Sequence, residues 1–381
     1  MKAAQGFGAV VLTGPRRAGK TYLLRHLFPR ADYVLLEDPD TLAQVRADPR
    51  GFLAERRPPV IIDEIQHAPE LFQYIRSILD RAPRRTGQWI LTGSQESTLM
   101  RGVTESLAGR AAIFNLLPLS VAESSRVDLF LGGYPEVLAR PRQRDAWFSS
   151  YVQSYLERDV RSVTGVRDLS TFRRFLGLVA SRHGQVLNRS DIASPLGVSV
   201  PTVSQWLSVL EVTGQILLLP PYFENFGKRL IKSPKLYIGD SGLACYLLGI
   251  RTRGELARSP FRGALFEGFV AAEIAKAQLN AGGRKELYFF RDRPGLEVDF
   301  VVPRGGELWL VEAKAGATVF PKDAQAIRAL LAGRGGPKKK RGLIVYQPSA
   351  RRSQTTVAAE NVKAVDLPTL VAALNNKKAL A

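Results

Sequence analysis

At residues 14–21 the chain reads Gly14-Pro15-Arg16-Arg17-Ala18-Gly19-Lys20-Thr21. The segment fits the phosphate-loop pattern G-x-x-x-x-G-K-[ST]; an apolar run at 9–12 precedes it and a helical pattern at 22–27 follows it. The glycines permit a loop whose backbone N–H groups face phosphates, and the positive end of the helix dipole adds to the attraction. We expect these residues to bind ATP, with Lys20 at the β- and γ-phosphates and the Thr21 hydroxyl as an Mg²⁺ ligand.

Four short apolar runs lie around this loop, at 9–12, 33–36, 60–62 and 89–91. Helical stretches separate them, which is typical of a parallel α/β sheet, and their apolar character indicates burial on both faces. The third run ends in Asp63 and Glu64, about 40 residues after the loop. Such a pair favours hydrolysis over mere binding of ATP. We expect Asp63 beside the Mg²⁺ and Glu64 as the group that polarises the attacking water.

Two further residues are candidates for the same chemistry. The fourth run leads into Gly93-Ser94-Gln95, where Ser94 is placed to sense the γ-phosphate; Thr92 fits that role as well, and the sequence does not choose between them. Arg110 is a candidate arginine finger, a residue that completes the ATP site of a neighbouring subunit. The alternative interpretation, which the sequence favours equally, is that Arg110 is an ordinary surface arginine.

Length and composition bound the class of protein. A chain of 381 residues predicts two or three domains at roughly 150 residues each. Apolar residues make up 45% and charged residues 23%, which excludes a wholly disordered or collagen-like chain. Lys and Arg number 54 against 35 Asp and Glu, and the net charge of +19 predicts a polyanionic partner, nucleic acid first and an anionic membrane surface second. An arginine-rich genome is the alternative explanation of that charge.

The few cysteines and histidines exclude other classes of site. The single Cys245 rules out internal disulfides and a Cys-cluster metal site, and three scattered histidines cannot form a multi-His zinc site. A lone cysteine fits the reducing cytosol. No run approaches 18 apolar residues, so we expect a cytoplasmic protein that does not enter membranes.

The texture of the sequence changes twice along the chain. We expect a P-loop ATPase domain at 1–140, a helical linker with a winged-helix domain at 141–254, and a second α/β domain at 255–381. In the last part a helix at 263–279 precedes a pair of strands, a second helix and a final strand. The basic run at 338–341 is expected to be a solvated loop.

The middle part carries a helix–turn–helix pattern. Asn188 begins a short helix, residues 195–198 make a turn, and Ser199 is a good N-cap for the next helix. That second helix exposes polar side chains such as Gln205, which are able to meet phosphates or base edges. The run at 214–219 is expected to be the wing strand. Winged helices also bind proteins, so a protein partner stays open here.

The C-terminal part concentrates carboxylates on two strands joined by a Gly305-Gly306 turn. Pairing outward from that turn places Asp299 opposite Glu312 and Glu297 opposite Lys314. Two acids so close repel each other unless a proton or a cation lies between them. We expect Mg²⁺ on Asp299 and Glu312, and Lys314 as the group that holds or deprotonates a water. A simple cross-strand ion pair between Glu297 and Lys314 is the alternative.

Short motifs run along nearly the whole chain: GPRRAGKT, IIDEIQ, LTGSQ, SLAGR, LLPLS, GGYPE, YLERDV, KSPKLYIGDSGL, GALFEGFVAAEI, EVDFVV and VEAKAG. Together they resemble a large prokaryotic family that joins an AAA+ ATPase domain to a C-terminal domain of unknown function related to PD-(D/E)xK nucleases. The resemblance implies that Asp299, Glu312 and Lys314 form the nuclease signature. It also implies that Glu267, in the helix before them, is a further metal ligand.

These features predict an α/β protein with a function on DNA. The first hypothesis is a DNA-stimulated ATPase that moves or remodels double-stranded or branched DNA, assembles as a homo-oligomer such as a ring, and carries an Mg²⁺-dependent nuclease-like domain. Its link to branched DNA, recombination and repair rests on analogy with AAA+ motors. The alternative is an ATP-switched DNA- or protein-binding regulator whose nuclease-like domain does not cleave. A third hypothesis is a small-molecule kinase, but it leaves the C-terminal half of the chain unexplained.

Overall fold

The computed structural model describes residues 2–93, 102–103, 105–156, 169–222, 232–292, 294–332, 339–348, 356–359 and 361–376. The chain folds into two compact units. The first consists of Met1–Pro118 with Val212–Gly214, and the second of Leu119–Glu211 with Gln215–Ala381.

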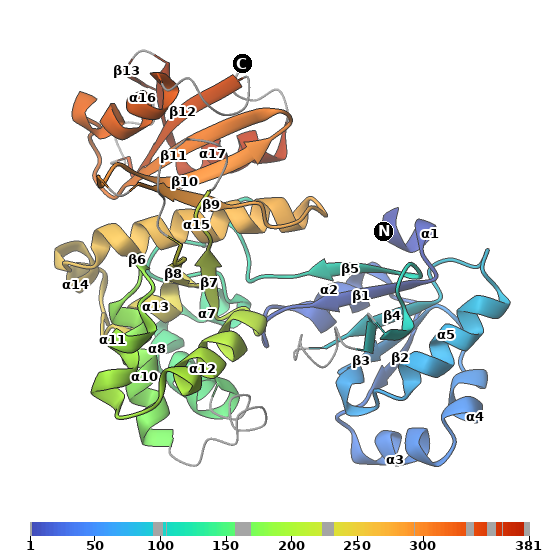
Figure 1. Cartoon of the computed structure of the whole chain (residues 1–381). Coiled ribbons are helices and arrows are strands. Elements are labelled where there is room, and N and C mark those ends of the chain that lie inside the picture. Colours follow the sequence, from blue (N-terminus) through green and yellow to red (C-terminus); the bar gives the residue numbers. More distant parts are fainter. Residues whose placement is uncertain are drawn as a thin grey trace. The chain divides into compact units, whose positions relative to one another are not determined.

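The first unit is built on a five-stranded sheet in the order β2-β3-β4-β1-β5 (Figure 1), and all its pairings are parallel. Its strands are β1 (Ala9–Thr13), β2 (Asp32–Leu35), β3 (Val60–Asp63), β4 (Trp89–Thr92) and β5 (Ala111–Asn115). Its helical segments include α1 (Lys2–Gly6), α2 (Lys20–Leu27), α3 (Pro39–Ala47), α4 (Pro49–Ala54), η1 (Ile65–His67) and α5 (Leu71–Arg81).

Both faces of this sheet are buried, as its apolar runs predict. Side chains alternate along a strand, so Val11 packs into the core that α5 covers while Leu12 packs beside Leu24 of α2. The four strands predicted from the apolar runs are present, and the parallel sheet of a P-loop ATPase domain is confirmed. The fifth strand, β5, was not predicted. Because all strands run the same way, the loops after β1, β3 and β4 meet at one edge.

The first part of the second unit is mainly helical. Its segments are α7 (Pro135–Ala139), η2 (Pro141–Gln143), α8 (Arg144–Tyr151), η3 (Val152–Leu156), α10 (Leu169–Ser181), β6 (Gln185–Val186), α11 (Arg189–Leu196), α12 (Val200–Val212), β7 (Ile216–Leu219), β8 (Lys235–Ile238), α13 (Ser241–Leu247) and α14 (Arg253–Arg258). The three strands form an antiparallel sheet in the order β6-β8-β7.

The helix–turn–helix residues lie close to their predicted places. Asn188 caps α11 by accepting a hydrogen bond from the Ser190 N–H, and Ser199 accepts one from the Thr202 N–H at the start of α12. One boundary was wrong. Pro195 lies inside α11, and the chain turns at Gly197, which adopts a left-handed φ of 66°. A left-handed glycine ends helices at little steric cost, so the turn is shorter than expected.

The C-terminal part of the second unit packs helices on a six-stranded sheet in the order β13-β14-β12-β11-β10-β9. Figure 1 shows the long helix α15 lying across this sheet. The segments are α15 (Arg262–Asn280), β9 (Tyr288–Arg291), β10 (Glu297–Arg304), β11 (Glu307–Lys314), η4 (Pro321–Ala324), α16 (Gln325–Ala332), β12 (Lys339–Tyr346), β13 (Thr356–Ala359), β14 (Val362–Asp366) and α17 (Leu367–Asn375).

The hairpin register is as predicted, since Arg304 pairs with Glu307 and Phe300 with Val311. The basic run at 338–341 was predicted to be a loop, and this was wrong for its described residues. Lys339 begins β12 and pairs with Glu307 of β11, whose carboxylate lies 2.6 Å from the Lys339 Nζ. That acid stabilises the basic strand end. Within the described ranges, no helix has the length and apolarity needed to span a bilayer.

Candidate nucleotide site and carboxylate cluster

The phosphate loop takes its shape from two glycines. Gly14 has a φ of 137° and Gly19 a φ of 99°, both in the region that favours glycine. A Cβ on Gly14 would lie 2.1 Å from the Leu116 carbonyl oxygen, so no side chain fits there. Gly19 is also the N-cap of α2, which directs the N-terminus of that helix at the loop. The backbone cradle predicted for phosphates is therefore present.

Three loop side chains pack inward. The Lys20 Nζ donates hydrogen bonds of 2.9 Å to the carbonyl oxygens of Gly14 and Pro15, and the lysine is buried. Arg16 is also buried and forms an ion pair of 3.5 Å with Glu37, whereas Ala18 packs into the interior. Arg17 takes a left-handed φ of 62°. Lys20 thus spans the loop from inside, with its charge held where phosphate oxygens bind.

The end of β3 is joined to the loop through Asp63. Asp63 Oδ2 accepts a hydrogen bond of 2.6 Å from the Thr21 hydroxyl and one of 2.8 Å from the Tyr33 hydroxyl. Burial raises the pKa of Asp63, and these two hydrogen bonds oppose the shift. Burial and the bond to Asp63 raise the pKa of Tyr33. Tyr33 was not predicted; a tyrosine in an otherwise apolar strand next to β3 was the available signal.

The same residues fit a magnesium ion. Asp63 Oδ1 is buried and has no hydrogen-bond partner in the described part of the chain. A buried carboxylate oxygen without a donor is costly unless a cation or water meets it. Thr21 and Asp63 supply hydroxyl and carboxylate oxygens, the kinds of ligand that Mg²⁺ takes beside substrate phosphates. These two residues would hold the ion.

Glu64 follows Asp63 in a strained conformation. Its φ is 58°, a left-handed value that costs a residue with a side chain on the order of 1 kcal/mol. Its carboxylate accepts a hydrogen bond from the Gln66 amide. Thr92 ends the neighbouring strand, and its buried hydroxyl has no hydrogen-bond partner among the residues described. Ser94, the other sensor candidate, lies outside the described residues.

Arg110 lies away from the phosphate loop of its own chain. It precedes β5, which is parallel to β1, so it stands at the opposite edge of the sheet. Its guanidinium donates to Asp80 at 2.5 Å and to the Ala108 carbonyl. The bond from Arg110 holds the pKa of Asp80 below its usual value. Arg110 therefore takes no part in the ATP site of the chain that carries it.

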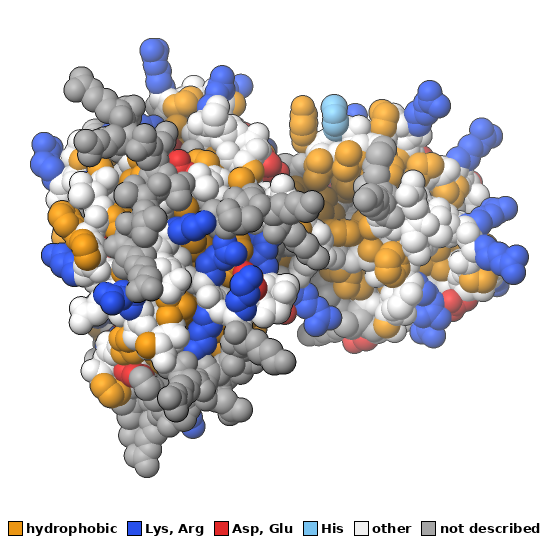
Figure 2. Space-filling view, turned by 90° about the horizontal axis from the view of Figure 1, so that it is seen from above, with side chains coloured by type: hydrophobic (Ala, Val, Ile, Leu, Met, Phe, Trp, Pro, Cys, Tyr) orange, Lys and Arg blue, Asp and Glu red, His pale blue; other side chains and the backbone are white. Residues whose placement is uncertain are grey.

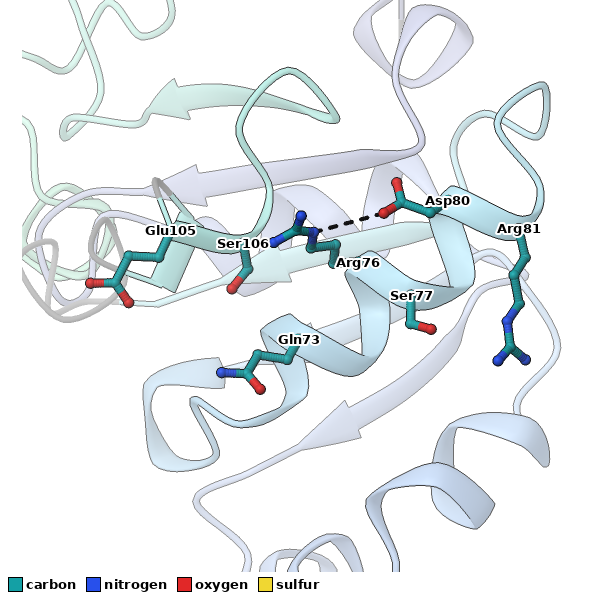
Figure 3. A pocket seen from close by; sticks show the side chains of 7 residues that line it. All are labelled: Gln73, Arg76, Ser77, Asp80, Arg81, Glu105 and Ser106. Carbon is teal, nitrogen blue, oxygen red and sulfur yellow. Dashed lines mark ion pairs between the residues drawn. The ribbon is translucent and has the colours of Figure 1, made fainter.

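A pocket of about 520 Å³ opens along α5 (Figure 3). In Figure 3 Arg76 and Asp80 face each other across one helical turn, 3.7 Å apart at their closest charged atoms. The lining residues are Gln73, Arg76, Ser77, Asp80, Arg81, Glu105 and Ser106. They belong neither to the phosphate loop nor to the end of β3, so the pocket is separate from the nucleotide site.

In the second unit the predicted carboxylates lie on three elements. Glu267 comes from α15, Glu297 and Asp299 from β10, and Glu312 with Lys314 from β11. The Lys314 Nζ donates to Glu312 at 2.8 Å, and Asp299 Oδ2 accepts a hydrogen bond of 2.9 Å from the Ala313 N–H. The structure thus brings the predicted acids into one neighbourhood. Lys314 forms its ion pair with Glu312, whereas the ion pairs of Glu297 are with other residues.

An unpredicted lysine lies among these acids. The Lys235 Nζ, from β8, is 2.8 Å from Glu267, 2.5 Å from Glu297 and 3.6 Å from Asp299. The Tyr237 hydroxyl, two residues along the same strand, donates to Glu267. Burial disfavours the charge of Lys235, but the three carboxylates outweigh it and raise the pKa of this lysine. We call these five residues the carboxylate cluster.

Glu312 lies next to this cluster and shares its electrostatics. Burial, and then the charge of Asp299, raise the pKa of Glu267 to about 7 and the pKa of Glu312 to about 8. Glu312 Oε2 is buried and has no hydrogen-bond partner in the described ranges. Acids with such values hold protons near neutral pH, which lowers the repulsion among them.

The acids do not form a metal centre as they stand. Across the part of the chain that the structure describes, no three Asp, Glu, His or Cys side chains are arranged to hold one metal ion. Two of the three predicted ligands, Glu267 and Asp299, contact the Lys235 ammonium, and the third, Glu312, contacts Lys314. The positive charges beside these carboxylates are therefore those of lysine side chains of the same chain.

Comparison with protein-family models matches three parts of the chain in turn. Residues 7–125 match an AAA domain, residues 123–254 a domain of unknown function (DUF8612), and residues 262–370 another domain of unknown function (DUF4143). The first match agrees with the geometry of the phosphate loop, so the chain carries an AAA-type ATPase domain. The predicted resemblance to prokaryotic AAA+ ATPases is confirmed, whereas the relation of the C-terminal domain to nucleases stays a prediction.

Several proteins are similar over long stretches. The uncharacterized protein Rv2008c of Mycobacterium tuberculosis is 35% identical over 330 residues, covering 84% of this chain and 73% of that protein. Mb2031c of Mycobacterium bovis gives the same values. An uncharacterized protein of Haemophilus influenzae is 26% identical over 280 residues, covering 63% of this chain and 69% of that protein.

Among solved structures, the Walker-type ATPase PABY2304 of Pyrococcus abyssi is similar with a TM-score of 0.44 and 16% identity, over 65% of this chain and 92% of that one. The mycobacterial matches extend through the phosphate loop domain and beyond it, since they cover most of both chains. This chain therefore belongs to the family of the two uncharacterized mycobacterial proteins, and in it an AAA domain precedes two domains of unknown function.

Proposed function

We propose that this AAA-type protein hydrolyses ATP to move or remodel DNA. ATP hydrolysis is supported by the geometry at the end of β3. Thr21 of the phosphate loop is hydrogen-bonded to Asp63, and Glu64 beside it is held in a strained conformation. Strain of this kind collects at functional sites, because the surrounding structure must hold the residue in place. A protein that only bound nucleotide would not need a strained acid at this strand end.

Each residue of the site has a role in this proposal. The phosphates of ATP lie against the loop N–H groups, and Lys20 exchanges its two carbonyl partners for phosphate oxygens. Thr21 and Asp63 would hold Mg²⁺, which would neutralise negative charge on the phosphates. Glu64 turns from Gln66 to orient the attacking water and take up its proton. The buried Thr92 hydroxyl donates to the γ-phosphate.

Charge and the helix–turn–helix support a DNA partner. Helices α10, α11 and α12 with the antiparallel sheet β6-β8-β7 follow the order expected of a winged helix. Helix α12 exposes Gln205 and Ser208, which are able to reach phosphates or base edges. The net charge is +19, and Figure 2 shows Lys and Arg side chains standing out from the surface on the face in view. Duplex or branched DNA fits this arrangement.

A neighbouring copy of the chain supplies the arginine finger in this proposal. Arg110 lies at the sheet edge opposite its own phosphate loop, so it can act only on another subunit. Such contacts close rings of subunits when each copy meets the next head to tail. The ion pair of Arg110 with Asp80 then holds the guanidinium at the surface until a neighbour binds.

The experiment that tests this function measures ATP turnover with linear, single-stranded and four-way-junction DNA over a range of salt concentrations. DNA should raise turnover, and the increase should fall steeply with salt, because phosphate contacts release counterions. Lys20→Ala is the control that removes nucleotide chemistry while leaving the winged-helix region unchanged. Turnover that no DNA form alters, together with no DNA binding at low salt, contradicts the proposal.

For the C-terminal domain we propose a nuclease-related fold that grips DNA without cutting it. The observation in favour is Lys235, whose ammonium contacts the carboxylates that a nuclease would use for metal ions. Supercoiled plasmid incubated with the protein in Mg²⁺ or Mn²⁺ should stay intact. Nicking that disappears in Asp299→Ala contradicts this proposal and restores the nuclease reading.

A further inference from the structure

The Lys235 ammonium is buried and shared among three acids. Its side chain is 3% exposed, and its partners are Glu267 of α15 with Glu297 and Asp299 of β10. The remaining side of the ammonium meets the Phe289 ring, whose centroid is 5.7 Å away. One positive charge therefore satisfies carboxylates from two different elements, in a place that water hardly reaches.

Burial of this kind is costly for either partner alone. A lysine loses its hydration when it is buried, and it keeps its charge only where acids compensate. Carboxylates brought this close repel one another unless a proton or a cation lies between them. The Lys235 ammonium and the acids therefore stabilise each other. A divalent ion placed among the same acids would lie within ion-pair distance of the ammonium and would be repelled by it.

We propose that Lys235 is the resident cation of the carboxylate cluster, and that it excludes divalent metal ions from the cluster. The same contacts fasten strand β8, and with it the sheet β6-β8-β7, to helix α15 and strand β10. The cluster then connects the winged-helix region to the C-terminal sheet without a metal ion. This proposal is independent of ATP hydrolysis, and it supplies the physical basis for a C-terminal domain that does not cut DNA.

Lys276 offers a matched control for this lysine. Its side chain is also 3% exposed, and its Nζ lies 2.8 Å from Glu273, which is fully buried. The Lys276–Glu273 pair has the same chemistry as Lys235 and one of its acids, but Lys276 forms an ion pair with a single carboxylate. Lys276→Met therefore removes an equally buried ammonium without exposing a group of acids that could take a metal ion.

The test is Mn²⁺ binding by the nucleotide-free full-length chain, measured by calorimetry and by the paramagnetic signal of free Mn²⁺. Asp63→Asn is present in every protein, so that the nucleotide site lacks the carboxylate that would hold a metal ion. Lys235→Met should gain one Mn²⁺ site per chain and bind about a hundredfold tighter than the parent, because a like charge at ion-pair distance is gone. The site should vanish when Asp299→Asn is added. Lys276→Met should bind as the parent does.

Two results would overturn the proposal. One is a parent protein that binds Mn²⁺ at the cluster, seen as a rise in its melting temperature with Mn²⁺ that Asp299→Asn removes. This comparison does not depend on whether Lys235→Met folds. The other is a folded Lys235→Met protein, with a circular dichroism spectrum like that of the parent, that binds no more Mn²⁺ than the parent. Neither readout involves ATP turnover or DNA cleavage.

Discussion

The Thr21 hydroxyl lies 2.6 Å from Asp63 Oδ2, so a hydrogen bond joins the end of the phosphate loop to the end of strand β3. The two residues are far apart in sequence, and the parallel sheet brings them to one edge. A site whose ligands are held together before the nucleotide binds loses less freedom on binding.

Thr21→Ala should weaken binding of Mg·ATP at least about tenfold, because the variant loses both a ligand and the bond that positions Asp63. Thr21→Ser keeps the hydroxyl and should bind nearly as the parent does. Fluorescent ATP titrated with and without Mg²⁺ measures the effect. If Thr21→Ala loses no more affinity with Mg²⁺ than without it, the role given to the hydroxyl is wrong.

Tyr33→Phe should lower the free energy of unfolding by about 1 kcal/mol, because Asp63 loses one of its two hydroxyl donors. It should also raise the pKa of Asp63 further, since the lost bond favours the ionised form. Urea unfolding followed by circular dichroism measures the first effect. Tyr22→Phe removes an exposed hydroxyl from α2 and should change stability little. Equal stability of the two variants would count against the Tyr33 contact.

His183 should make stability fall in acid. Burial lowers its pKa to about 4, against 6.5 for the unfolded chain, while its Nδ1 accepts a hydrogen bond from the Ile238 N–H. The unfolded imidazole therefore takes up a proton that the folded one does not. The contribution of His183 to the free energy of unfolding is fully present above pH 6.5 and is lost as pH falls toward 4.

His183→Asn keeps an acceptor near Nδ1 but does not titrate. The advantage of the parent over His183→Asn in free energy of unfolding should shrink by about 2 kcal/mol between pH 7 and pH 5. Chemical denaturation at both pH values measures it. An advantage that stays constant would mean that the folded imidazole takes up protons as readily as the unfolded one.

Arg110→Ala and Glu64→Gln should each lose turnover alone and regain part of it when mixed. An Arg110 from the Glu64→Gln chain then meets an intact Glu64 of the Arg110→Ala chain, in roughly a quarter of random interfaces. Asp80→Ala frees the Arg110 guanidinium from its ion pair and should keep turnover. Mixtures no more active than their components would exclude an arginine finger at this position.

The nucleotide site could be predicted because its signals are local. The loop, the β3 acids and the strands are each short patterns, and parallel strands bring the ends of β1 and β3 to one edge. Tyr33 was missed because its role depends on strand order. The register of Arg304 with Glu307 followed from a two-residue turn.

The carboxylate cluster shows what local patterns leave out. Lys235 comes from a strand of another sheet, and only tertiary packing places it beside Glu267. A lysine and Tyr237 alternating with apolar residues along β8 indicate a polar contact on one face, but not its partner. The acids were therefore predicted without the cation that lies among them.

The role of Glu64 in hydrolysis is tested most directly by the release of phosphate from ATP by the parent and by Glu64→Gln, at concentrations where both are saturated with nucleotide. We expect Glu64→Gln to bind Mg·ATP as tightly as the parent and to release phosphate at least about a hundredfold more slowly. Equal rates in the two proteins would contradict this role, because the strained acid at the end of β3 would then have no part in hydrolysis.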